Sequence, residues 1–122
     1  MAHINNWEDK GLYREFTNSV TGKEVLNINL TLQGDPRFDE IKYVINDFTQ
    51  ITDFDFSDID IKRIVVTDNV AALSNPVLKI ALIITLEPLL EWANIYCKYM
   101  KDSPYICEIF DNVSDAKKWV YK

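Results

Sequence analysis

The chain has 122 residues, the size of one domain that can bury a core without disulfide or metal cross-links. Hydrophobic residues make up 48% and charged residues 26% of it, a composition that excludes a disordered chain. The net charge is −6 and no run of Lys or Arg occurs, so we expect no binding to nucleic acid and no long-range attraction to anionic lipid.

The amino-terminal part of the chain predicts a β-hairpin followed by a helix. Residues 3–7 and 11–17 flank a short turn that ends in glycine, which favours an antiparallel pair of strands. Thr21 and Glu24 then form a capping-box pattern, in which each side chain satisfies a backbone N–H at the start of a helix. Gly34 and the Asp-Pro that follows it predict the end of this helix.

The rest of the chain alternates between strands and helices. Residues 41–47 are apolar at nearly every position and rich in β-branched side chains, as in a strand buried on both faces. An acidic loop follows and leads to Ser57, which caps a helix that carries Leu73 and ends at 74–76. A strand over 78–84 and a helix over 87–101 come next, with Pro88 in the first turn of that helix. The last elements are a strand over 105–110 and a terminal helix that begins at Asn112 or Ser114 and runs through Trp119.

The predicted order of elements is ββαβαβαβα over a single domain, residues 1–122. Strands that alternate with helices require right-handed crossovers, which build a largely parallel sheet with covered faces. The sequence therefore predicts an α/β fold with a mixed, mostly parallel sheet, an amino-terminal hairpin and about four helices.

Several segments in this order are similar to those of a known family. The Trp-containing hairpin, "TGKE" at the first helix, "GDPRFDEIKYVINDF", "DNVAALSNPVLKIALI" and the final "SDAKKWV" together resemble the STAS domains, and in particular the SpoIIAA-like branch of uncharacterised bacterial proteins. STAS domains include the anti-sigma-factor antagonists, so the resemblance implies a non-enzymatic regulatory module that works through protein contacts. The SpoIIAA-like branch also implies binding of apolar ligands or membrane surfaces and self-association.

The acidic stretch 46–57 occupies the position of the family's phosphorylation switch. In the antagonists an Asp at a strand end leads to Asp-Ser-Ser-Gly at the next helix, and the first serine is phosphorylated. In this chain Asp47 and Asp55 match the two aspartates, Phe56 falls on the switch serine and Ser57 on its neighbour. The acceptor is missing, and aspartates at the start of the helix would repel an incoming phosphate. We therefore expect Ser57 to cap the helix without being phosphorylated.

The sequence offers little for catalysis or for a cofactor. The single histidine, His3, lies near the chain start, and no glycine-rich phosphate loop is present. A calcium loop beginning at Asp53 lacks its required Gly and its bidentate Glu, so we expect no metal and no cofactor. An enzyme using Asp47 or Asp68 is an alternative, but we expect each of these carboxylates to be buried and to accept hydrogen bonds from the backbone or from Tyr.

The helix over 87–101 carries more apolar side chains than one face of a sheet needs. Leu86, Leu89, Leu90, Ala93, Cys97 and Met100 form an ordinary core stripe. A second stripe of apolar side chains runs beside it, and three roles are open to it: it completes a tight core, binds a partner or lines an apolar cavity. Trp and Tyr suit the last two roles because they combine a large area with a polar tip. Together with two aromatics of the acidic stretch, the second stripe supplies the predicted ligand- or partner-binding residues, which are Trp92, Ile95, Tyr96, Tyr99, Phe54 and Phe56.

Two functions from different classes follow. The first is a non-enzymatic binding module that acts through a homodimer or a regulatory protein partner. The second is a small carrier or sensor of an apolar, lipid-like ligand that associates with membranes. The chain start lacks the pattern of a signal peptide, and no apolar run approaches the roughly 20 residues of a transmembrane helix, so we expect a cytoplasmic protein. Cys97 and Cys107 are expected to be two buried, reduced thiols.

Overall fold

The structure, a computed structural model, describes residues 2–122. Ten elements follow one another along the chain, and their order agrees with the predicted ββαβαβαβα apart from one 3₁₀ turn. They are β1 (Ala2–Trp7), β2 (Gly11–Thr21), α1 (Gly22–Gln33), η1 (Pro36–Glu40), β3 (Tyr43–Asp55), α2 (Asp58–Ala71), β4 (Lys79–Ile83), α3 (Glu87–Tyr99), β5 (Ile106–Phe110) and α4 (Val113–Val120).

The strands form one sheet in the order β1-β2-β3-β4-β5. The hairpin strands β1 and β2 are antiparallel, and each later strand pairs in parallel with the strand before it. The prediction of a mixed, mostly parallel sheet with an amino-terminal hairpin is confirmed. Because every crossover advances by one strand in the same direction and is right-handed, α1, α2 and α3 must all pack on one face.

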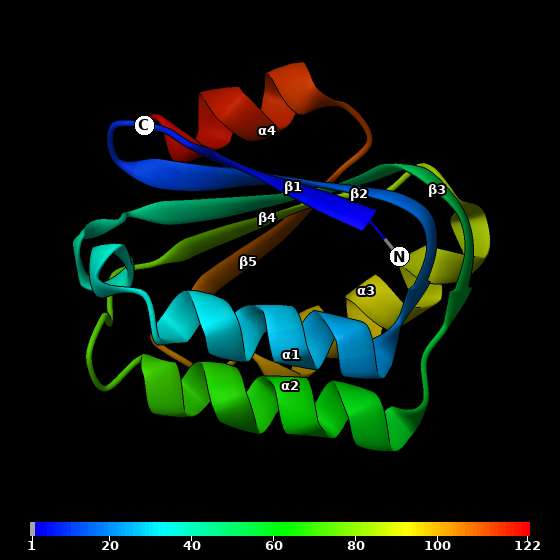
Figure 1. Cartoon of the computed structure of the whole chain (residues 1–122), viewed down its shortest axis with the longest axis horizontal. Coiled ribbons are helices and arrows are strands. Elements are labelled where there is room, and N and C mark those ends of the chain that lie inside the picture. The colour runs from blue at the N-terminus through cyan, green and yellow to red at the C-terminus, as the bar shows by residue number, and fades with distance from the viewer. Residues whose placement is uncertain (1) are drawn as a thin grey trace.

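Figure 1 shows this division into layers, with α1, α2 and α3 on one face of the sheet and α4 alone on the other. Two separate hydrophobic clusters result. The larger one lies between the sheet and the three helices and includes Leu12, Phe16 and Val44. The smaller one lies under α4 and includes Tyr13 and Ile45. Neighbouring residues of a strand thus enter different clusters, as the alternation of side chains along a strand requires.

The acidic stretch 46–57, which the sequence predicted to be a loop, is mostly strand. β3 continues to Asp55 beside β2, which itself continues past residue 17 to Thr21. The prediction was wrong because the stretch was judged by its charge. Phe54 and Phe56 alternate with Asp53 and Asp55, which is the two-residue period of a half-buried strand.

The extension of β2 and β3 is irregular. The pairing register shifts between Glu15 and Thr17 and again between Asn18 and Ser19, and Asn18 has a positive φ of 64°. Such bulges increase the local twist of a strand pair. The extended pair curves toward the amino-terminal ends of α1 and α2 (Figure 1).

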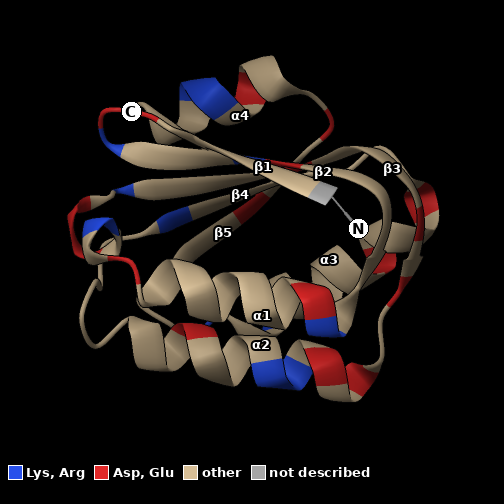
Figure 2. Cartoon of the chain, viewed as in Figure 1, with Lys and Arg blue, Asp and Glu red and all other residues tan. Residues whose placement is uncertain are grey.

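The predicted helix starts are confirmed in detail. Thr21 and Glu24 form a complete capping box at α1, and Ser57 forms another with Asp60 at α2. Asn112 caps α4, which decides between the two predicted starts of that helix. Acidic side chains gather at the start of α2 (Figure 2), where they favour the positive end of the helix dipole.

Exposed large apolar side chains are more numerous on α2 than on α3, where Tyr99 is exposed. Leu73, which the sequence placed on the buried face of its helix, is 87% exposed, because α2 ends at Ala71 and Leu73 falls in the turn beyond it. Ile59, Val66 and Val70 are spaced along one outward face of α2, and Leu73 follows them in the turn after the helix; we call these four residues the α2 stripe. No helix within residues 2–122 has the length and apolar character needed to cross a membrane.

Candidate functional site, a cavity between the sheet and three helices

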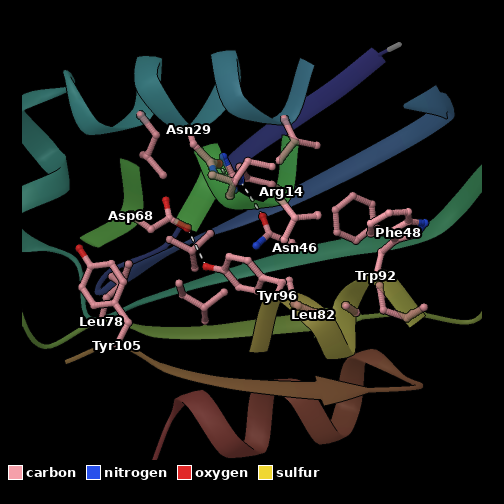
Figure 3. Close-up of a pocket in the computed structure, with 18 of the residues that line it drawn as sticks. Arg14, Asn29, Asn46, Phe48, Asp68, Leu78, Leu82, Trp92, Tyr96 and Tyr105 are labelled. Carbon is pink, nitrogen blue, oxygen red and sulfur yellow. Dashed lines mark hydrogen bonds between the residues drawn. The ribbon is translucent and has the colours of Figure 1, made fainter. Parts of the chain in front are cut away.

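A cavity of about 90 Å³ lies between the sheet and helices α1, α2 and α3. Apolar side chains make up most of its wall, among them Val44, Phe48, Leu82, Leu89, Trp92 and Ala93. A few polar side chains also line it, and they are concentrated in the middle and at one end (Figure 3). A mostly apolar wall with a few convergent polar groups is typical of a small-molecule site.

Arg14 is the central polar group of this cavity. It extends from β2 with 3% of its surface exposed. Its Nε donates a hydrogen bond to Oδ1 of Asn46, and its Nη2 donates one to Oδ1 of Asn29, both at 2.8 Å (Figure 3). Its Nη1 is buried and has no acceptor within residues 2–122. Burial lowers the pKa of Arg14 to about 10, against the opposing effect of Asp68, so the side chain remains a cation at neutral pH.

Asp68 is the carboxylate of the same cavity. Its oxygens accept hydrogen bonds from the hydroxyl of Tyr96 at 2.6 Å and from Nε2 of Gln33 at 3.1 Å. Burial raises the pKa of Asp68 to about 6, although the bond from Tyr96 and the charge of Arg14 act in the opposite direction. No ion pair joins Arg14 to Asp68 or to another carboxylate of the described chain. The two charges therefore share one apolar chamber without direct contact.

The opposite end of the cavity is aromatic. Phe48, Phe56 and Trp92 line it, beyond the carboxyl end of β4. The ring centroids of Phe56 and Trp92 are 6.5 Å apart, and those of Phe54 and Phe56 are 5.9 Å apart. Phe56 and Trp92 are only partly buried, so this end of the cavity lies next to solvent. In α/β folds ligands commonly bind beyond the carboxyl ends of the strands.

The predicted binding residues divide into three groups. Trp92, Tyr96 and Phe56 line the cavity, and Phe54 packs against Phe56. Ile95 is half-buried against the core and does not line the cavity. Tyr99 is 40% exposed and donates a hydrogen bond to Asp58, outside the cavity. Tyr96 belongs to the buried face of α3, so Tyr99 is the one exposed residue of the second apolar stripe expected on this helix.

The predicted switch residues do not form a loop site. Asp47 lies inside β3 and is buried, where it accepts hydrogen bonds from the hydroxyl of Tyr13 and from the N–H of Thr49. Asp55 is exposed at the end of the strand, and Ser57 is occupied as a helix cap. Because Tyr13 belongs to the cluster under α4, Asp47 and Asp68 lie on opposite faces of the sheet and cannot act as a pair.

The two cysteines, which the sequence predicted to be buried, are only half-buried, and they contact each other. Both are free and half-buried, one on α3 and one on β5. A hydrogen bond from Cys107 lowers the pKa of Cys97, and the same bond together with burial raises the pKa of Cys107. Within residues 2–122, no cluster of three His, Cys, Asp or Glu side chains has the arrangement of a metal site.

Sequence reasoning missed Arg14, Asn29 and Asn46. A signal for two of them was present. Leu12, Arg14 and Phe16 occupy alternate positions of one strand and so share a face, and Asn46 stands in the same way within an apolar strand. Polar side chains at inward positions of buried strands need partners, and the pattern could have marked them as a buried polar group.

Comparison with known proteins supports the fold. The sequence matches no protein-family model and no curated protein. Its structure is similar to that of an uncharacterised protein of the DUF3478 family with a SpoIIAA-like fold, from Shewanella loihica PV-4, with a TM-score of 0.58 at 16% identity. The similarity covers 98% of this chain and 92% of that protein. The predicted resemblance is thus confirmed at the level of the fold, which is SpoIIAA-like.

Proposed function

We propose that this protein is a non-enzymatic carrier or sensor that binds a small, mostly apolar molecule in the cavity between the sheet and helices α1, α2 and α3. The observation that carries the proposal is the cavity itself, which combines an apolar wall with a buried, incompletely paired Arg14. A domain of this size ordinarily closes its core to a density that leaves few voids larger than a water molecule. A retained cavity with its own polar group is therefore better explained by a ligand than by packing.

The size of the cavity limits what it holds. A volume of about 10–15 Å³ accommodates one water molecule and about 150 Å³ accommodates benzene, so about 90 Å³ fits a functional group with a few attached carbons. A longer ligand would have to extend past Phe56 and Trp92 at the solvent side. Movement of these two partly exposed rings would lengthen the chamber without disturbing the sheet.

A substitution that fills the cavity tests this proposal. Ala93 lines the cavity from α3, so Ala93→Leu should occupy the space and abolish binding of 1-hexanol in an NMR titration. Asn94→Leu adds similar apolar bulk to the exposed face of the same helix and should leave binding unchanged. Native mass spectrometry of the purified protein should also show an adduct that Ala93→Leu lacks. Equal hexanol binding by the wild type and Ala93→Leu would refute the cavity as the site.

A second candidate function has its own observation. The α2 stripe exposes four large apolar side chains, three on one face of α2 and Leu73 in the turn after it, which favours a module that self-associates through α2. An apolar helix face is complementary to its own copy across a two-fold axis, so the partner would be a second copy of this chain. Sedimentation velocity should then show a dimer that Val66→Lys and Val70→Lys convert to a monomer. A wild-type monomer at high concentration would remove this candidate.

A further inference from the structure

The charge of Arg14 is incompletely compensated for a side chain so deeply buried. Asn29 and Asn46 accept two of its hydrogen bonds through neutral amide oxygens, which supply no negative charge. Moving a cation out of water costs several kcal/mol, and proteins ordinarily offset this cost with a contacting anion. Asp68 is near enough to raise the pKa of Arg14, but its oxygens accept hydrogen bonds from Tyr96 and Gln33 and not from Arg14.

We propose that Nη1 of Arg14 is the anchor for a carboxylate, and that the ligand of the cavity is a carboxylic acid with a linear apolar tail. The inference rests on the proposed function and specifies the head group of its ligand. The carboxylate accepts a hydrogen bond from Nη1 in the middle of the cavity. The tail lies along Phe48 and Leu89 toward Phe56 and Trp92, which line the apolar end next to solvent.

The surroundings favour a carboxylate over other anions. A phosphate dianion has three oxygens to satisfy and carries about two charges, whereas the unpaired donors of the described cavity are Nη1 of Arg14 and the hydroxyl of Tyr105, and only Arg14 is a cation. Asp68 on the other side of Arg14 would repel a dianion more strongly than a monoanion. A carboxylate needs fewer donors, and its single charge balances the single charge of Arg14.

Asn29 and Asn46 have a defined part in this arrangement. Their amide oxygens hold Nε and Nη2 of Arg14, each at 2.8 Å, and so fix the plane of the guanidinium (Figure 3). With the plane fixed, Nη1 is presented without loss of side-chain freedom when the ligand binds, and this raises affinity. Both asparagines are therefore positioning residues.

The wild-type protein alone provides the first test. Hexanoate and hexanamide have the same shape and the same tail, but only hexanoate carries a charge at neutral pH. Titration of ¹⁵N-labelled protein should show hexanoate binding about tenfold or more tightly than hexanamide, because hydrogen bonds between charged groups are stronger than those to neutral groups. Hexanoate should also shift the Nε–H resonance of Arg14, and hexanamide should shift it less.

Two substitutions in the cavity should have opposite effects. Arg14→Met removes the cation and should weaken hexanoate binding about tenfold or more, so that hexanoate binds no more tightly than hexanamide. Asp68→Asn removes the repelling carboxylate with little change of shape and should strengthen hexanoate binding, with no such gain for hexanamide. Arg37→Met removes one positive charge from an exposed side chain and should change neither affinity. A purely structural role of Arg14 would not produce opposite signs at these two positions.

Each outcome decides between the proposals. If hexanoate and hexanamide bind equally and Asp68→Asn favours neither, the cavity binds apolar molecules but the carboxylate inference is wrong. If neither compound nor 1-hexanol shifts resonances of cavity residues, both the inference and the proposed function are wrong. If Arg14→Met does not fold, the comparison of the two ligands on the wild type and on Asp68→Asn still decides.

Discussion

The buried carboxyl group of Asp68 should make stability depend on pH in a direction opposite to that of ordinary surface carboxylates. Burial raises its folded-state pKa to about 6, whereas in the unfolded chain it titrates near 4. Between these values the folded state holds a proton that the unfolded state has lost, so the stability contributed by Asp68 is fully present below about pH 4 and is lost as pH rises through about 6. A difference of about two pKa units corresponds to about 3 kcal/mol.

The substitution Asp68→Asn isolates this effect. Asparagine keeps the shape and an acceptor for Tyr96 or Gln33 but does not titrate. Urea unfolding of both proteins from about pH 4 to about pH 7 should show the variant gaining on the order of 2–3 kcal/mol relative to the wild type as pH rises. Asp58→Asn is the control. The hydrogen bond from Lys62 lowers the pKa of Asp58, so the stability that Asp58 contributes is lost only as pH falls below about 4, and this variant should show no comparable gain between about pH 4 and about pH 7.

The reasoning fails if the difference in free energy of unfolding between the wild type and Asp68→Asn stays constant with pH. It also fails if the wild type becomes more stable relative to Asp68→Asn as pH rises. Either result would mean that Arg14 and Tyr96 stabilise the carboxylate at least as much as burial destabilises it. The cavity would then hold a neutralised pair, and the argument for an anionic ligand beside Arg14 would be weaker.

Two further predictions concern stability. Nδ2 of Asn75 donates to the buried carbonyl oxygens of Phe38 and Ile41, at 2.7 and 2.9 Å, so Asn75→Ala should lower the free energy of unfolding by about 2–4 kcal/mol in urea unfolding. A loss below about 1 kcal/mol would show that water replaces the amide. Ser57→Ala removes the cap of α2 and should cost about 1 kcal/mol, whereas Ser57→Asp should restore most of it; a phosphate found on Ser57 by intact-mass analysis would contradict its role as a cap alone.

Local features of the sequence were sufficient for the order and type of the elements. Thr21 with Glu24 and Ser57 before Asp60 mark helix starts because a cap involves residues three positions apart, and the structure has both. The alternation of strands and helices predicted the parallel sheet because a right-handed crossover is a property of each strand–helix–strand unit. The SpoIIAA-like fold could be predicted from the sequence because it is defined by this order of elements.

The acidic stretch 46–57 could not be predicted correctly from its local sequence. Asp53 and Asp55 suggested a loop, but residues 50–55 are strand because residues 17–21 of β2 lie beside them and supply hydrogen bonds. The exposure of α2 could not be predicted either. Whether Val66 and Val70 are covered depends on what packs against α2, and that is decided by elements distant in the sequence.

The cavity is the feature that only the tertiary structure could reveal. Arg14, Asn29, Asn46 and Asp68 come from four different elements, and no spacing in the sequence relates them. A void is what remains when three helices and a sheet meet, so it depends on the shapes of many side chains together. The sequence alone determined which elements form and in which order. Packing decided that Arg14 would be buried with Nη1 unpaired, because whether a donor finds an acceptor depends on the assembled core.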